Sequence, residues 1–140
     1  MPPTVDDLVS YFSAGAKPRA DFRVGIEQEK IGVRDDGRAI PYGGAEGIAE
    51  VLHRLEGRGF SGTREDGQLI ALERSGDRIT VEPGGQLELS GAALPTAAAS
   101  RDAIARHVRE VNEVAQPLGI RFLGVGMRPF GTIDEVDWLP

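Results

Sequence analysis

The chain has 140 residues, of which 40% are hydrophobic and 27% are charged, a composition typical of a globular protein and not of a disordered or fibrous one. Its formal net charge of −6 argues against nucleic acid as the main partner, because a phosphate backbone requires clustered Lys and Arg. There are no cysteines, which excludes a disulfide, a thiolate nucleophile and a cysteine-ligated zinc site.

No apolar run approaches the roughly 20 residues that a membrane-spanning helix needs, so no membrane partner is expected. The first residues, 1–7, lack the basic and apolar regions of a signal peptide. The lack of cysteine fits a reducing compartment. These features together predict a cytoplasmic protein.

The first predicted element is a helix that Thr4 is placed to cap. A long strand is predicted over residues 22–33, and the turn signal of residues 35–37 closes it. The apolar residues at helical spacing on one face of the first helix are Val5, Leu8, Val9 and Phe12.

A second helix is predicted near residues 45–56, where apolar residues recur at helical spacing. Residues 68–91 predict a compact antiparallel meander, because three apolar runs are separated by very short turns. A third, longer helix is predicted over residues 96–116, with Thr96 as its cap. Residues 120–126 predict a last apolar strand.

Strand alternation predicts an acidic face on this sheet. Side chains in a strand point alternately to the two faces, so Glu27 and Glu29 share one face. By the same alternation Glu82, Gln86 and Glu88 point to one side of the meander. The apolar residues expected on the opposite side, within the core, are Phe22, Val24, Ile26, Ile79, Val81, Leu87 and Leu89.

Two interpretations of this face stay open at this level. Two carboxylates about 4 Å apart repel by roughly 4 kcal/mol at an effective dielectric constant of about 20. A bound Mg²⁺ reverses the sign of that energy, because hard divalent cations take carboxylate and phosphate oxygens as ligands. The same alternation also describes a half-solvated antiparallel sheet that has no metal–nucleotide site.

Three other ionisable residues fall on predicted elements. Arg23 lies four residues before Glu27, an even spacing that puts both side chains on the same face of the predicted strand. There it is placed to contact a phosphate or carboxylate, with a plain salt bridge as the alternative. His53 and His107 fall on predicted helices without a second ligand at metal spacing, which favours solvated or capping side chains.

Several segments resemble one known family. Residues 24–32, with two glutamates one residue apart after a glycine, resemble the first-strand motif of plant-type glutamate–cysteine ligases. Residues 79–91, which contain Glu-Pro-Gly-Gly-Gln, are similar to the most characteristic segment of that family. Residues 117–126 and 135–140 resemble later family segments in the expected order. The resemblance covers nearly all of the chain from about Phe22 onward.

The resemblance implies a fold and a domain organisation. The expected fold is α+β, with a curved antiparallel sheet and helices on one face, like the catalytic domains of glutamine synthetase and the guanido kinases. Residues 1–140 would be the amino-terminal part of a single catalytic domain. More chain follows in the family, and the tail after residue 133 ends without a closing element, so we interpret the chain as truncated at its C-terminus.

The resemblance also implies a function. The expected reaction is the ATP-dependent ligation of glutamate to cysteine through γ-glutamyl phosphate, the first step of glutathione biosynthesis, with Mg²⁺ as the cofactor. The expected partners are glutamate, cysteine, ATP and the remainder of the ligase chain. By motif position, Glu27, Glu29, Glu82 and Glu88 would be metal ligands, with Glu27 and Glu82 catalytic and with Gln86 and Arg23 in substrate or nucleotide binding.

Two alternatives remain beside this function. One is another carboxylate–amine ligase of the same superfamily with a different amine acceptor. The other is a non-catalytic module that binds glutamate or a nucleotide. The isolated chain is expected to be inactive, because it supplies one acidic wall and no basic cluster to hold phosphates from the other side.

Overall fold

The computed structural model describes residues 2–139. Within them the α-helices are α1 (Val5–Ala14), α2 (Ile48–Glu56) and α3 (Ala97–Ala115). The strands are β1 (Val24–Val33), β2 (Ser61–Glu65), β3 (Gln68–Arg74), β4 (Asp77–Glu82), β5 (Gln86–Leu94) and β6 (Arg121–Leu123). Short 3₁₀ turns occupy Arg19–Asp21, Gln116–Leu118 and Ile133–Glu135.

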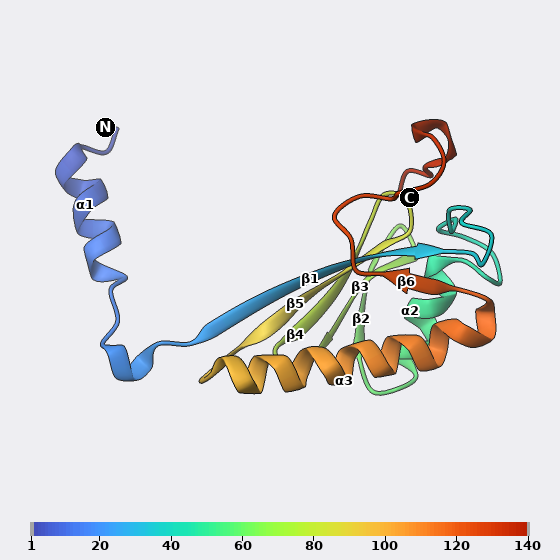
Figure 1. Ribbon diagram of the computed structural model, residues 1–140. Coiled ribbons are helices and arrows are strands. Elements are labelled where there is room, and N and C mark those ends of the chain that lie inside the picture. The colour runs from blue at the N-terminus through green and yellow to red at the C-terminus, as the bar shows by residue number, and fades with distance from the viewer. Residues whose placement is uncertain (1, 140) are drawn as a thin grey trace.

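All six strands form one antiparallel sheet in the order β2-β3-β4-β5-β1-β6 (Figure 1). The prediction that residues 22–33 and 68–91 share one antiparallel sheet is confirmed, because β1 pairs with β5 over most of its length. Strand β2 was not predicted. All five of its residues are exposed, so it carries no apolar alternation, and only its pairing with β3 reveals it.

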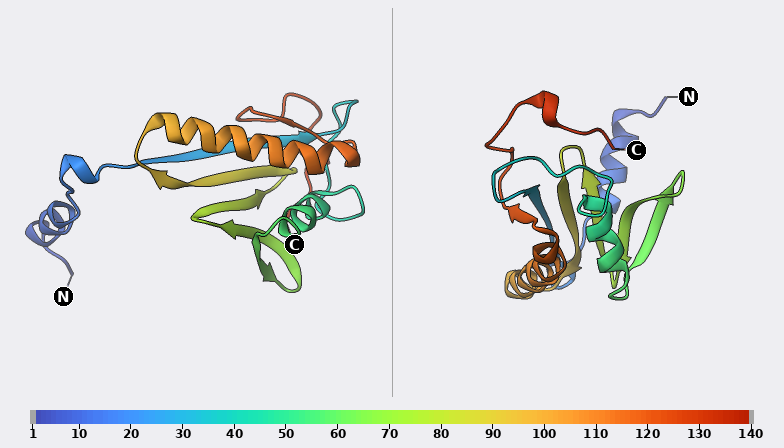
Figure 2. Two further views of the ribbon diagram at one scale, coloured as in Figure 1. Left: turned by 90° about the horizontal axis from the view of Figure 1, so that it is seen from below. Right: turned by 90° about the vertical axis from the view of Figure 1, so that its right-hand side faces the viewer.

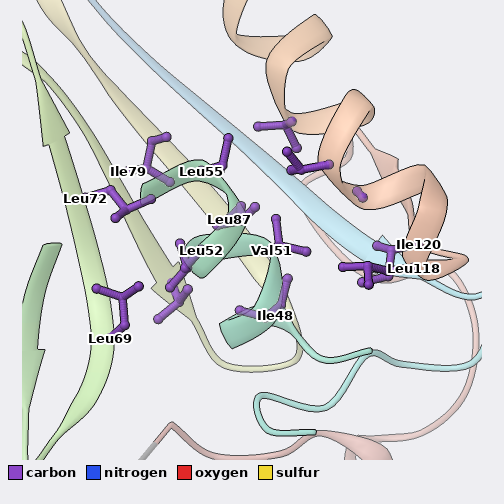
Figure 3. Packing of buried hydrophobic residues seen from close by; sticks show 14 of the residues in the cluster. Ile48, Val51, Leu52, Leu55, Leu69, Leu72, Ile79, Leu87, Leu118 and Ile120 are labelled. Atoms are coloured by element: carbon purple, nitrogen blue, oxygen red, sulfur yellow. The ribbon is translucent and has the colours of Figure 1, made fainter. Parts of the chain in front are cut away.

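Helices α2 and α3 cover one face of the sheet and also contact each other (Figure 2). Side chains of α2 point into the sheet and meet those of α3 and of the turn that follows it (Figure 3). The fully buried members of this core include Ile48, Val51, Leu52, Leu55, Leu72, Ile79, Leu87 and Ile120. Burial of such side chains stabilises the fold by about 1.5–3 kcal/mol each.

The predicted core is confirmed in the meander and wrong at the start of β1. Ile79, Leu87 and Leu89 are buried, as is Val81. Phe22 is 60% exposed and Val24 is 37% exposed, and Ile26 is only half-buried. The reason is that the chain before and at the start of β1 extends beyond the layer formed by the helices (Figure 1).

Helix α1 stands apart from the rest of the fold (Figure 1). Its predicted cap is confirmed, since the Thr4 hydroxyl accepts from the Asp7 amide and the Asp7 carboxylate accepts from the Thr4 amide. Its apolar stripe is not covered, however, and Val5 and Phe12 are both 76% exposed. Local capping therefore defines this helix without tertiary packing.

The other boundaries differ modestly from those predicted. Helix α2 begins at Ile48 and not at Ala45, because Gly47 is extended and serves as its N-cap. Strand β6 ends at Leu123, before the glycine-containing residues 124–126, which favour strands weakly. Helix α3 agrees with the prediction, and the Thr96 hydroxyl caps it.

The α+β class is confirmed, as an open six-stranded antiparallel sheet with helices. The relation to glutamine synthetase and the guanido kinases stays a prediction. Among residues 2–139, no helix combines the length and the hydrophobicity that crossing a membrane would require.

Candidate functional site on the acidic face

The strand register places the four glutamates on one face of the sheet. Glu29 of β1 lies directly opposite Glu88 of β5, and Glu27 lies opposite Ser90. Glu82 of β4 lies opposite Gln86 of β5. Residues that face each other across a ladder point to the same side, with Cβ atoms about 4.5–5.5 Å apart. We call this side of the sheet, which α2 and α3 leave uncovered, the acidic face.

The carboxylates of the acidic face have no ion-pair partner in the described part of the chain. Among residues 2–139, ten acidic side chains form ion pairs, and Glu27, Glu29, Glu82 and Glu88 are not among them. Glu88 accepts one hydrogen bond, from the Ser90 hydroxyl at 3.1 Å. Like charges directly opposite each other, as at Glu29 and Glu88, destabilise a sheet.

The structure brings these residues together as pairs and not as one compact cluster. In the part of the chain that the structure describes, no three His, Asp or Glu side chains gather closely enough to hold one metal ion. Neighbouring strands are about 4.8 Å apart, so side chains on a sheet face spread over the surface. A magnesium ion bound to a nucleotide needs only one or two protein carboxylates, with phosphates and water completing its shell. The donor set therefore fits phosphate-bound magnesium.

The loop between β4 and β5 sets the position of Glu82 relative to Gln86. Its glycines, Gly84 and Gly85, have φ angles of 80° and 76°, which side-chain-bearing residues rarely adopt. The Gly85 carbonyl accepts from the Gly32 amide at 2.9 Å. A Cβ atom at Gly85 would lie 2.9 Å from the carbonyl oxygen of Ile40. The characteristic Gly-Gly segment is thus required by backbone conformation and by close packing.

We expect Gly85→Ala to lower the free energy of unfolding by about 1–3 kcal/mol, because it adds strain at positive φ and a clash with Ile40. Urea unfolding of the chain measures this loss. The matched control is Gly67→Ala, where φ is 82° but nothing lies within 4 Å of the added Cβ. Equal losses in the two variants would contradict the role assigned to the close approach.

Arg23 does not join the acidic face in this structure. It precedes β1, and its guanidinium donates to the carbonyls of Phe22 at 2.8 Å and Ala20 at 3.3 Å. Gln86 does join it, as a half-buried residue opposite Glu82. The binding roles of both residues stay predictions.

A buried polar pair on the opposite face was missed. The Lys30 ammonium lies 2.7 Å from His107 Nε2, and the two residues are only 3% and 5% exposed. Burial lowers the pKa of Lys30 to about 8. Burial, together with the positive charges of Lys30 and Arg74, lowers the pKa of His107 to about 3.

The prediction of a solvated or capping His107 is therefore wrong, whereas His53 is largely exposed beside Glu56, as expected. Lys30 lies four residues after Ile26, so strand alternation predicts that its side chain points to the core side of β1. A lysine at a core-facing position of a strand is the feature of the sequence that indicates a buried polar partner.

Comparison with known proteins identifies similar sequences. Residues 23–140 match the sequence profile described as Glutamate-cysteine ligase family 2. The chain is 36% identical to glutamate–cysteine ligase A, chloroplastic, of Oryza sativa subsp. japonica, a match over 99% of this chain and 28% of the relative. It is 34% identical to the chloroplastic enzyme of Arabidopsis thaliana and 36% identical to that of Nicotiana tabacum, each over 99% of this chain and 26% of the relative.

The chain thus spans little more than a quarter of the length of these curated relatives. Their names also overturn the expectation of a cytoplasmic location. All three are named as chloroplastic proteins and not as cytoplasmic ones.

Proposed function

The chain belongs to glutamate–cysteine ligase family 2, and from that membership we propose that it is the amino-terminal part of a single catalytic domain that ligates glutamate to cysteine at the expense of ATP. The observation that carries this proposal is the acidic face, with its four glutamates on one side of the sheet and none of them in an ion pair among the described residues. Such a surface is unfavourable for a purely structural sheet and suits the binding of a metal–nucleotide complex.

The proposed reaction has two steps. An oxygen of the glutamate γ-carboxylate attacks the terminal phosphorus of ATP, which forms γ-glutamyl phosphate and releases ADP. The amine of cysteine then attacks the acyl carbon, loses a proton and expels inorganic phosphate, which leaves γ-glutamylcysteine. Both steps depend mainly on holding the reactants in line and apart from water.

We assign the roles of the acidic face by position. Glu29 and Glu88, directly opposed across β1 and β5, would hold one magnesium ion, and Glu27 and Glu82 would contribute to the same metal–nucleotide site. When bound, magnesium would neutralise the negative charge of the ATP phosphates. The carboxamide of Gln86 is placed beside Glu82, where its amino group can donate to a substrate oxygen and orient it.

The proposal is tested on the full-length protein that contains this segment. We expect ADP release that requires both glutamate and cysteine and that yields the dipeptide, with no product when magnesium is removed. Other amino acids and amines are offered in place of cysteine as controls. Faster ligation of another amine would identify a different carboxylate–amine ligase, and absence of ADP release with every acceptor would favour a non-catalytic module.

The isolated 140-residue chain is expected to show no measurable ligation. An acyl phosphate must be protected from hydrolysis, and the acidic face is an open surface with exposed Glu27 and Glu29. The assay is dipeptide formation by the purified chain with ATP, glutamate, cysteine and magnesium. Turnover in the usual enzyme range of about 1–10³ s⁻¹ would show that the site is already complete.

A further inference from the structure

A small cavity lies on the opposite side of the sheet from the acidic face, between α3, β1 and β6. Its volume is about 120 Å³. The polar residues that line it are Gln28, Lys30 and Asn112, and the apolar ones include Val108, Val111 and Phe122. We call it the α3 cavity. Nothing in the proposed ligation uses it.

Lys30 brings an unbalanced positive charge to the α3 cavity. No carboxylate pairs with it in the described residues 2–139, and its neighbour His107 offers only a ring nitrogen. Arg74, whose charge acts on the neighbouring His107, already has its own counter-ion, Glu110, at 2.6 Å. Burying a charge without a counter-ion is costly, so such a site favours an anion. An ammonium that donates once to His107 still has two protons to donate.

Gln28 brings an unused acceptor to the same cavity. Its Oε1 atom is buried and accepts no hydrogen bond within the described part of the chain. Gln28 and Lys30 are two residues apart in β1, so their side chains point to the same side of the strand. A buried polar atom without a partner costs free energy, which an incoming donor would recover.

We propose that the α3 cavity binds a small carboxylate that also carries a hydrogen-bond donor, the chemistry of an α-amino acid or a 2-hydroxy acid. The carboxylate accepts from the Lys30 ammonium and the Asn112 amide, and the ligand's ammonium or hydroxyl donates to Gln28 Oε1. The volume suits this class, since a cavity of about 150 Å³ holds benzene and a ligand of about five heavy atoms is smaller.

The site is independent of the proposed ligation. Its residues lie on the helix-covered face, whereas the four glutamates lie on the other face. The α3 cavity can therefore bind or fail to bind its ligand whether or not the acidic face binds a nucleotide. The test needs no turnover and uses the 140-residue chain.

The experiment titrates the chain with glycine, glycolate and acetate at neutral pH and follows the side-chain amide resonances of Gln28 and Asn112. We expect saturable shifts with a dissociation constant in the millimolar range for glycine or glycolate, because so small a ligand makes few contacts. Acetate, which lacks the donor, should bind at least about 10-fold more weakly, given that a hydrogen bond to a charged or buried group is worth about that factor.

Variants assign the binding to the α3 cavity. Lys30→Met should weaken binding at least about 10-fold, and Lys17→Met, at an exposed lysine, should leave it unchanged. Asn112→Leu alters a half-buried position and serves as the second variant if Lys30→Met does not fold. Unsaturable shifts, as expected for a cavity filled only by water, would overturn the proposal. So would acetate that binds as tightly as glycolate, or binding that is unchanged in both variants.

Discussion

Replacing Glu88 with glutamine is expected to lower the turnover of the proposed full-length ligase by about 100-fold or more and to stabilise the 140-residue chain in metal-free buffer. The first effect follows from the proposed role of Glu88, because the substitution would remove a charged magnesium ligand with almost no change in shape. The second follows from the register, because Glu88 faces Glu29 and neither carboxylate forms an ion pair among residues 2–139. Relief of such a cross-strand repulsion is worth about 0.2–1 kcal/mol.

Steady-state ADP release over a range of magnesium concentrations measures the first effect, and urea unfolding with and without magnesium measures the second. Glu65→Gln is the matched control, since Glu65 is exposed on β2 and outside the acidic face, and neither quantity should change. Turnover and magnesium dependence that survive in Glu88→Gln would contradict the assignment of this residue to the proposed magnesium site. Glu82→Gln should lose turnover as severely without the gain in stability, because Glu82 faces Gln86.

Acidification is expected to cost the chain several kcal/mol of unfolding free energy through His107 alone. Its pKa is about 3 in the folded protein and 6.5 as the ordinary value. Because the folded pKa is the lower one, the neutral imidazole contributes its full stability above pH 6.5 and loses it progressively as the pH falls toward 3. At about 1.4 kcal/mol per pH unit, the loss amounts to roughly 5 kcal/mol at most.

The measurement compares urea unfolding of the wild type and of His107→Gln from pH 7 to pH 3. Glutamine keeps an acceptor for Lys30 and does not titrate, so the stability difference between the two proteins should shift in favour of the variant as the pH falls. His53→Gln is the control at an exposed histidine and should follow the wild-type profile. Parallel profiles for the wild type and His107→Gln would mean that His107 is not held neutral by its surroundings.

By itself, the sequence determined the elements whose signals are local. The Thr4 and Thr96 caps and the short turns of residues 68–91 specified helices and strands within a few residues of their observed bounds. Alternation along each strand was enough to put Glu27 with Glu29 and Gln86 with Glu88 on one side of their own strands, because side chains in a strand repeat every second residue whatever the strand pairs with. The family motifs are also short stretches that can be recognised without the fold. In the Gly84-Gly85 segment, the positive φ angles of the turn favour glycine at both positions.

Only the tertiary structure decided which residues meet. Glu29 and Glu88 are 59 positions apart, and their opposition depends on the pairing of β1 with β5, which no local pattern encodes. The residue pattern around β1 could not reveal that the helices leave Phe22 and Val24 uncovered. Nor could it reveal that Lys30 is buried against His107 of α3. Strand β2, fully exposed, exists through its hydrogen bonds to β3. Register, burial and charge pairing arise from contacts between distant segments, so they are properties of the folded chain.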